Sequence, residues 1–206
     1  MRIRVLALVV LCGVMAACAT TSTPQPKKRA QIQVQEQVGF TISEPVSVSD
    51  AVRMDYDSAL LLLEQGQTDE GIAILERVVA DAPDVSGPRI DLGIAAHRKG
   101  DLEAAEQHLL AALELNPDHP VVHNELGIIY RKTGRFGEAR RSYEAALAIY
   151  PGYHHARRNL GVLCDLYLAD LECALESYQA YLQTVPEDAQ ASMWIADLQY
   201  RMGRQE

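Results

Sequence analysis

Aromatic residues, cysteines and positive charges are all scarce in this 206-residue chain. Aromatic side chains make up 6% of it, fewer than a β-sandwich or barrel of this length usually carries. Four cysteines are too few for a scaffold held together by disulfides. The net charge of −9 argues against nucleic acid as the main partner, because binding there needs clustered cations. The remaining composition, 48% hydrophobic and 23% charged, favours an acidic, helical, single-domain protein.

A long apolar run is also missing, since about 20 apolar residues are needed to cross a bilayer as a helix. Residues 1–17 instead combine two arginines, a short apolar stretch and a small-residue end, the pattern of a cleaved signal peptide. Residues 15–18 read Met-Ala-Ala-Cys and resemble the lipobox of bacterial lipoproteins. The resemblance implies that Cys18 is lipidated and, with Ala19 after it, that the protein is sorted to the outer membrane and faces the periplasm. An ordinary secretory signal that ends beside a cysteine is the alternative.

Residues 18–50 are rich in Thr, Ser, Gln and Pro and poor in large apolar side chains. Such a segment buries too little surface to offset its ordering entropy, so we expect a flexible tether. Between Ile32 and Ile42, apolar and polar residues alternate, which is a weak strand signal. A strand here would become ordered only by pairing with the domain or with a partner.

From Ala51 onward the sequence repeats at an interval of 34 residues. The positions that recur are a glycine after leucine, an alanine and a proline: Gly93, Gly127 and Gly161; Ala105 and Ala139; Pro83, Pro117 and Pro151. Small residues let two helices approach closely, and proline ends a helix because it cannot continue the hydrogen-bond ladder. This grid resembles the tetratricopeptide repeat. The resemblance implies an all-α fold, a right-handed superhelical solenoid of about four helix-turn-helix units that bury their apolar faces by stacking.

The repeats are expected over residues 51–186, with a capping helix and tail at 187–206. The first unit is degenerate, because alanine and glycine exchange places at Ala59 and Gly71. The fourth unit has one extra residue between Cys164 and Ala174. The expected units are 52–85, 86–119, 120–153 and 154–188.

Cys164 and Cys173 flank this insertion on the two antiparallel helices of the fourth unit. In an oxidising periplasm, a pair of nearby thiols tends to be joined, so we expect a disulfide between them. The alternative is two buried free thiols that pack as small apolar groups.

Catalytic signatures are absent from the sequence, which has no Ser-His-Asp, nucleotide-binding or CxxC motif. We therefore expect neither an enzyme nor a cofactor. Four histidines are candidate metal ligands, but their spacing does not place them on one helix face, and we expect no metal site. They are His119, His123, His154 and His155.

In tetratricopeptide proteins, the first helix of each unit lines a concave groove that binds peptides. Carrying those positions over by register gives Leu60, Ile94, His97, Arg98, Asn124, Ile128, Arg131, Arg158 and Val162. The ninth position of every unit is apolar here, whereas the chaperone-binding subclass has asparagine in its carboxylate clamp. Recognition of a chaperone's C-terminal carboxylate is therefore disfavoured. The alternative is that part of this stripe belongs to the inner core.

These features indicate a non-catalytic adaptor that is anchored to the outer membrane by its lipid and binds an envelope protein or peptide in its groove. The overall design resembles repeat lipoproteins of type IV and Flp-type pilus assembly, others that recruit peptidoglycan hydrolases, and others found with TonB-like systems. None of these resemblances selects one pathway. The alternatives are a self-associating structural component, which makes a homo-oligomer, and a metal-binding carrier.

Overall fold

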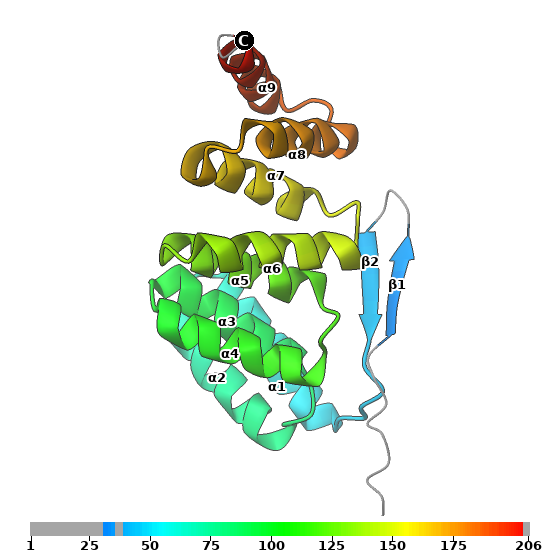
Figure 1. Ribbon diagram of the computed structural model, residues 1–206. Helices are drawn as coiled ribbons and strands as arrows, with labels where there is room; N and C mark the ends of the chain where they lie inside the picture. Colours follow the sequence, from blue (N-terminus) through cyan, green and yellow to red (C-terminus); the bar gives the residue numbers. More distant parts are fainter. Residues whose placement is uncertain (1–30, 36–38, 204–206) are drawn as a thin grey trace, which may run out of the picture.

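The computed structural model describes residues 31–35 and 39–203. The predicted signal peptide and the predicted lipidation site, Cys18, lie outside the described residues. Over the described part of the chain, nine α-helices follow a two-stranded antiparallel sheet (Figure 1). None of these helices is long and apolar enough to span a membrane. The elements are β1 Gln31–Gln35, β2 Gly39–Ser43, α1 Asp50–Glu64, α2 Thr68–Asp81, α3 Gly87–Lys99, α4 Leu102–Leu115, α5 Pro120–Lys132, α6 Phe136–Ile149, α7 His154–Leu163, α8 Leu171–Thr184 and α9 Ala189–Met202.

The helices form four consecutive antiparallel pairs that stack into a solenoid, which confirms the predicted all-α fold (Figure 1). Each pair is one helix-turn-helix unit, from α1 with α2 to α7 with α8. Helix α9 packs against α8 and covers the last unit. First helices of neighbouring units also meet, α3 with α5 and α5 with α7, so together they form one continuous face.

Local signals in the sequence explain where the helices begin and end. Asp101, Asp170 and Asp188 accept a hydrogen bond from the backbone N–H three residues on, which caps α4, α8 and α9 at their N-termini. The turns of the first three units place Gly66, Gly100 and Gly134 at φ of 79°, 86° and 77°, a conformation that side chains with a Cβ rarely adopt. Helices α2, α4, α6 and α8 each end shortly before a proline.

Glycine on the first helix sets the closest approach within the second, third and fourth units. Gly127 is on α5, and the ring of Tyr143 on α6 lies over it. A Cβ added to Gly127 would lie 2.4 Å from that ring. Equivalent pairs are Gly93 with Leu109 at 2.6 Å and Gly161 with Tyr178 at 2.5 Å. The first unit reverses the arrangement, because there Gly71 on α2 would meet Leu63 of α1 at 2.8 Å.

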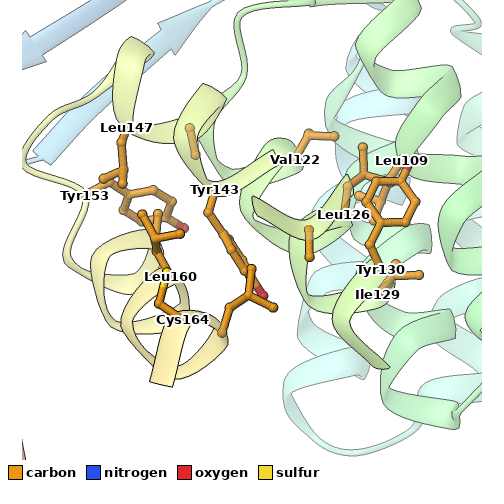
Figure 2. Close-up of a cluster of buried hydrophobic side chains, with 14 of the residues drawn as sticks. Leu109, Val122, Leu126, Ile129, Tyr130, Tyr143, Leu147, Tyr153, Leu160 and Cys164 are labelled. Atoms are coloured by element: carbon orange, nitrogen blue, oxygen red, sulfur yellow. The ribbon is translucent and has the colours of Figure 1, made fainter. Parts of the chain in front are cut away.

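A continuous core runs from the second unit to α9, and Figure 2 shows its middle part. Tyr143, Leu109 and Ile129 are completely buried in this core. The first unit has a separate, smaller cluster around Leu75. The main hydrophobic core therefore lies in the second to fourth units.

The extra residue of the fourth unit is absorbed by a single π-helical turn, Cys164–Leu168, at the end of α7. A π-helical turn holds one residue more than an α-helical turn between bonded groups. Here the N–H of Asp170 donates to the carbonyl oxygen of Cys164 at 2.9 Å. Ala169, at φ 53°, takes the place that glycine has in the other turns.

Residues 31–35 and 39–49, which we call the N-terminal arm, differ from the expected flexible tether. Strands β1 and β2 pair with each other from Gln31 opposite Ser43 to Gln35 opposite Gly39. Phe40 of β2 packs edge-on against two tyrosines of the loop between α6 and α7, with ring centroids 5.4 Å from Tyr150 and 6.0 Å from Tyr153. The two halves of the segment with the strand signal thus pair with each other. The aromatic contacts of Phe40 supply burial that composition alone does not reveal.

Glu44, the residue that follows β2, fixes the arm to the start of α3. Its carboxylate accepts hydrogen bonds from the backbone N–H of Ser86, at 3.0 Å, and from the Ser86 hydroxyl. Ser86 is the residue that precedes α3, so the carboxylate also lies at the positive end of that helix dipole. The arm therefore bridges the loop between α2 and α3 and the loop between α6 and α7.

Replacing Gly127 with alanine tests the role of the glycine positions. We expect Gly127→Ala to lower the free energy of unfolding by about 1–3 kcal/mol, because the Tyr143 ring must move to admit the new Cβ. Urea unfolding followed by circular dichroism measures the change. The matched control is Gly137→Ala at an exposed position of α6, where the nearest atom lies 3.7 Å away and alanine should stabilise the helix by about 0.5–1 kcal/mol. Equal effects at both positions would contradict the close-approach argument.

Candidate peptide-binding groove

The first helices present one apolar side chain each at the same register of the repeat. All of these side chains are partly buried, and those of the second to fourth units pack against the main core. They form what we call the apolar ladder: Leu60, Ile94, Ile128 and Val162. Because α3 contacts α5 and α5 contacts α7, the members Ile94, Ile128 and Val162 lie on one face of the solenoid. Each side chain thus rests on the core and keeps part of its surface accessible.

Cationic side chains lie near the C-terminal ends of α3 and α5, next to the ladder. Arg98 and Lys132 are exposed, and neither forms an ion pair with any described residue. Arg131 lies over the ring of Tyr167, 5.6 Å from its centroid, and its Nη1 donates to the hydroxyl at 3.4 Å. Arg158 of α7 is exposed and lies 5.3 Å from the centroid of the Trp194 ring. This face therefore presents positive charge on a protein whose net charge is −9.

Polar side chains form a hydrogen-bonded row beneath this surface. Asn159 donates to the Asn124 amide oxygen at 2.9 Å, and Asn124 donates to the Glu125 carboxylate at 3.2 Å. The other oxygen of that carboxylate lies 3.5 Å from Nδ1 of His97. Asn124 is only 2% exposed and both ends of its amide are bonded. It thus connects α5 to α7, and its amide is not available to a ligand without breaking these bonds.

Burial shifts the protonation of this row. Burial raises the pKa of the Glu125 carboxyl, although Asn124 and the nearby Arg98 oppose the shift. Burial, together with the positive charges of Lys132 and Arg98, lowers the pKa of His97. His97 is therefore neutral at pH 7, so the positive charge of the groove comes from its arginine and lysine side chains.

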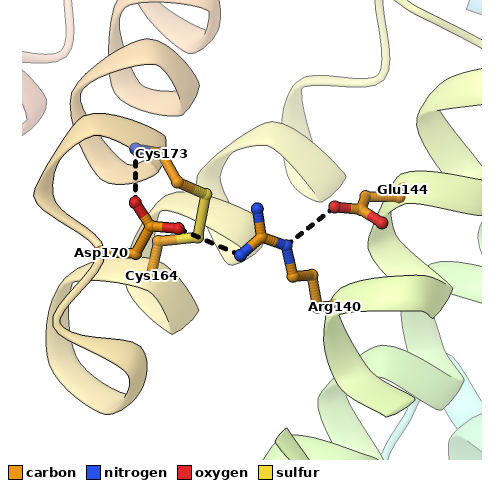
Figure 3. Close-up of a disulfide and its surroundings, with 5 residues drawn as sticks. All are labelled: Arg140, Glu144, Cys164, Asp170 and Cys173. Atoms are coloured by element: carbon orange, nitrogen blue, oxygen red, sulfur yellow. Dashed lines mark hydrogen bonds and ion pairs between the residues drawn. A yellow bond between two sulfur atoms is a disulfide. The ribbon is translucent and has the colours of Figure 1, made fainter. Parts of the chain in front are cut away.

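A disulfide joins the π-helical turn to α8 (Figure 3). Cys164 and Cys173 are bonded, with their Cα atoms 5.9 Å apart. Arg140 of the third unit donates to Asp170 at 3.0 Å and to Glu144 at 2.9 Å beside the bond. The same π-helical turn carries two side chains that reach other helices: Asp165, 2.7 Å from Arg201, and Tyr167, whose ring centroid is 5.0 Å from that of Phe136.

The four histidines do not come together as a ligand set within the described residues. There, the one grouping with metal-binding geometry is Cys164, Asp170 and Cys173, and its two cysteines are consumed by the disulfide. His119 is largely buried, and its burial, aided by His123, lowers its pKa to about 4. The Nε2 of His123 lies 2.8 Å from the carbonyl oxygen of Pro117. The rings of His154 and His155 lie against each other, with centroids 4.1 Å apart.

Sequence reasoning missed that the register of the first helices continues onto α9. Ala196 lies 35 residues after Gly161, so α9 follows the register of a first helix. Met193 and Tyr200 then occupy the same positions as Arg158 and Asp165 of α7, and their side chains are 71% and 65% exposed. Continuing the 35-residue spacing of the fourth unit through the capping helix would have found them.

A separate cavity of about 350 Å³ lies between the N-terminal arm and the first two units. Its walls are mainly apolar and include Ile42, Val48, Val78 and Val85, and Tyr56 and His119 also line it. The Tyr56 hydroxyl donates to Asp91 at 2.6 Å, and burial raises the pKa of both groups. The arm forms one wall, so this cavity exists only when the arm is docked.

Stacked helical pairs with a shared face of first helices define the class of helical-repeat scaffold proteins. Three tetratricopeptide repeat models match the chain, at residues 55–84, 84–152 and 165–206. The chain therefore belongs to the tetratricopeptide repeat proteins. One curated relative, a protein O-mannosyl-transferase of Caenorhabditis elegans, is 27% identical over 120 residues, which cover 58% of this chain and 16% of that protein.

Solved structures show the same architecture. MamA of Desulfovibrio magneticus RS-1 superposes with a TM-score of 0.68 at 22% identity, covering 76% of this chain and 88% of that one. PilF of Pseudomonas aeruginosa gives 0.67 at 20% identity, covering 75% and 70%. YrrB, a TPR protein with an unusual peptide-binding site, gives 0.60 at 21% identity, covering 69% and 73%. At these identities the likeness shows the fold alone, and this fold is typically non-catalytic.

Removing the disulfide should destabilise the fourth unit. A bond that closes a loop of about ten residues contributes about 2–3 kcal/mol, so we expect the double variant Cys164→Ala, Cys173→Ala to lose that much. Amide hydrogen exchange resolved by mass spectrometry should show faster exchange in α7 and α8. Exchange in α3 and α4 serves as the internal control and should be unchanged. Unaltered protection of α7 and α8 would mean that the disulfide does not stabilise this unit.

Proposed function

We propose that this protein is a non-catalytic adaptor that binds a peptide or helix of a partner protein in the groove of its first helices. The observation that carries the proposal is the apolar ladder, which remains partly accessible and is bordered by unpaired cations. Apolar side chains that converge with a few polar groups are the usual composition of a peptide-binding groove. YrrB, a protein of the same fold that is described as having an unusual peptide-binding site, is consistent with this use.

The chemistry of the groove specifies the kind of ligand. Arg98 and Lys132 are exposed and form no ion pair with a described residue, although both act electrostatically on the Glu125 carboxyl. An amphipathic segment whose apolar side chains cover Ile94 and Ile128 would place acidic side chains against these cations. Complementary charge of this kind favours the correct partner and speeds association. The proposed ligand is therefore an acidic amphipathic peptide.

The proposed site of action is the periplasmic face of the outer membrane. The support is the lipobox-like ending at Cys18 and the short apolar stretch before it. Lipid chains would hold the protein to the bilayer, because each buried methylene contributes about 0.8 kcal/mol. A partner from an envelope complex, such as a pilus, secretion or TonB-like assembly, fits this location. The groove is then tethered near the complex that it binds.

A charge on the apolar ladder should abolish ligand binding. We expect Ile128→Glu to weaken binding by about tenfold or more, because the new carboxylate would be desolvated against the ligand's apolar side chains. The measurement is binding of purified protein to an array of overlapping peptides from envelope proteins. The control is Leu110→Glu, at a 42% exposed leucine on the second helix of its unit, which should bind as the unaltered protein does.

The same array tests the charge preference. Peptides that are retained should be acidic, and Arg98→Glu with Lys132→Glu should lose them. If folded Ile128→Glu, with unchanged helical circular dichroism, retains the same peptides, the partner uses another face. If Ile128→Glu loses its helical signal, the ladder is core.

Replacing Cys18 by serine tests the membrane anchor. We expect Cys18→Ser to move the protein from the membrane fraction to the soluble fraction, because no lipid can then be attached. Fractionation in high salt, followed by immunoblotting, gives the measurement. The control is Cys12→Ser, which changes a cysteine within the apolar run and should leave the protein in the membrane fraction. Membrane retention of the Cys18 variant would contradict the lipoprotein proposal.

A further inference from the structure

Strand β1 is an edge strand whose inner neighbour is anchored to the solenoid. Its five residues pair with β2 from Gln31 opposite Ser43 to Gln35 opposite Gly39. Strand β2 carries the contacts to the helices, through Phe40, and Glu44 follows directly after it. In Figure 1, β1 lies on the far side of β2 from the helices. Among residues 31–35 and 39–203, β2 is the one strand that pairs with β1, and the other edge of β1 is unpaired there.

The composition of β1 does not protect this edge. Natural edge strands usually discourage pairing with lysine, proline, inward charges or a bulge. Strand β1 reads Gln-Ile-Gln-Val-Gln and has none of these residues, and its register with β2 is regular over all five positions. Because β1 carries no charged residue, a second copy of this strand would meet no like charge along it.

We propose that β1 pairs antiparallel with β1 of a second copy, which gives a symmetric dimer with a four-stranded sheet in the order β2, β1, β1, β2. The sequence of β1 has the same polar and apolar pattern in both directions. The register that pairs all five residues places Gln33 opposite Gln33 on the two-fold axis, Ile32 opposite Val34, and Gln31 opposite Gln35. An antiparallel pairing centred in this way keeps polar residues on one face and apolar residues on the other. A contact in which the same patch serves both copies is the usual form of a dimer interface.

The sheet itself supplies a reason for pairing. A two-stranded hairpin is stabilised by packing against helices or by further strands, and here it is β2 that carries the contacts to the solenoid. Pairing of β1 with its copy would double the number of strands. Because β2 attaches each solenoid, the two solenoids would lie at the outer edges of the sheet and away from the two-fold axis. The interface is separate from the peptide groove, so the two proposals stand or fall independently.

Charge exchange at the two-fold axis tests the proposal. The full chain is purified in detergent, and its protein mass is determined by light scattering with the detergent contribution subtracted. We expect the unaltered protein to have the mass of two chains. Gln33→Lys and Gln33→Glu, each alone, should weaken association by about tenfold or more, because like charges would face each other across the axis. An equal mixture of the two variants should form the dimer again, with one chain of each kind.

Thr41→Lys is the matched control. Thr41 is the partner of Gln33 on β2, and both side chains are exposed. A lysine there would lie one strand further from the axis in each copy, so this variant should remain a dimer. The proposal is overturned if the unaltered chain has the mass of one copy, if either Gln33 variant alone remains a full dimer, or if the mixture stays monomeric. A monomeric chain would leave the edge to a strand of a different protein.

Discussion

The close contact between a glycine on one helix and a large side chain on its neighbour is the constraint on which the rest of the structure depends. Tyr143 lies over Gly127 at a distance that no Cβ could share. This contact sets the separation of the paired helices, and the separation sets how successive units stack. Stacking then decides which side chains of the first helices remain accessible. The groove is therefore a consequence of helix packing, since no unit forms it alone.

The 34-residue grid made the helical pairs predictable, because glycine, alanine and proline at fixed spacing act locally on helix packing and helix ends. It also located the extra residue of the fourth unit. It did not reveal the π-helical turn that absorbs this residue, since the same insertion could have lengthened the loop. The docked N-terminal arm was not predictable, because the packing of Phe40 on Tyr150 joins segments about a hundred residues apart.

The candidate groove, too, was predictable from the sequence only in part. Its register follows from the repeat, and the structure places Leu60, Ile94, Ile128 and Val162 in equivalent positions on one face. The role of Asn124 depends on its neighbours, because its amide donates to Glu125 on the same helix and accepts from Asn159 on α7. Sequence periodicity identifies which face a side chain lies on. Whether that side chain is engaged by another element is decided by contacts that the period does not encode.

The N-terminal arm has a mechanical consequence for the solenoid. The curvature of a stack of helical pairs accumulates from unit to unit, because each unit touches only its neighbours and the small rotations between them add. The arm attaches to Ser86 at the start of the second unit and to Tyr150 and Tyr153 at the end of the third. The arm therefore links the two ends of the segment that carries Ile94 and Ile128, and it restrains the rotation of these two units relative to each other. The fourth unit and α9 lie outside the segment that the arm spans, and there the Cys164–Cys173 disulfide and the Arg201–Asp165 ion pair supply the cross-links instead.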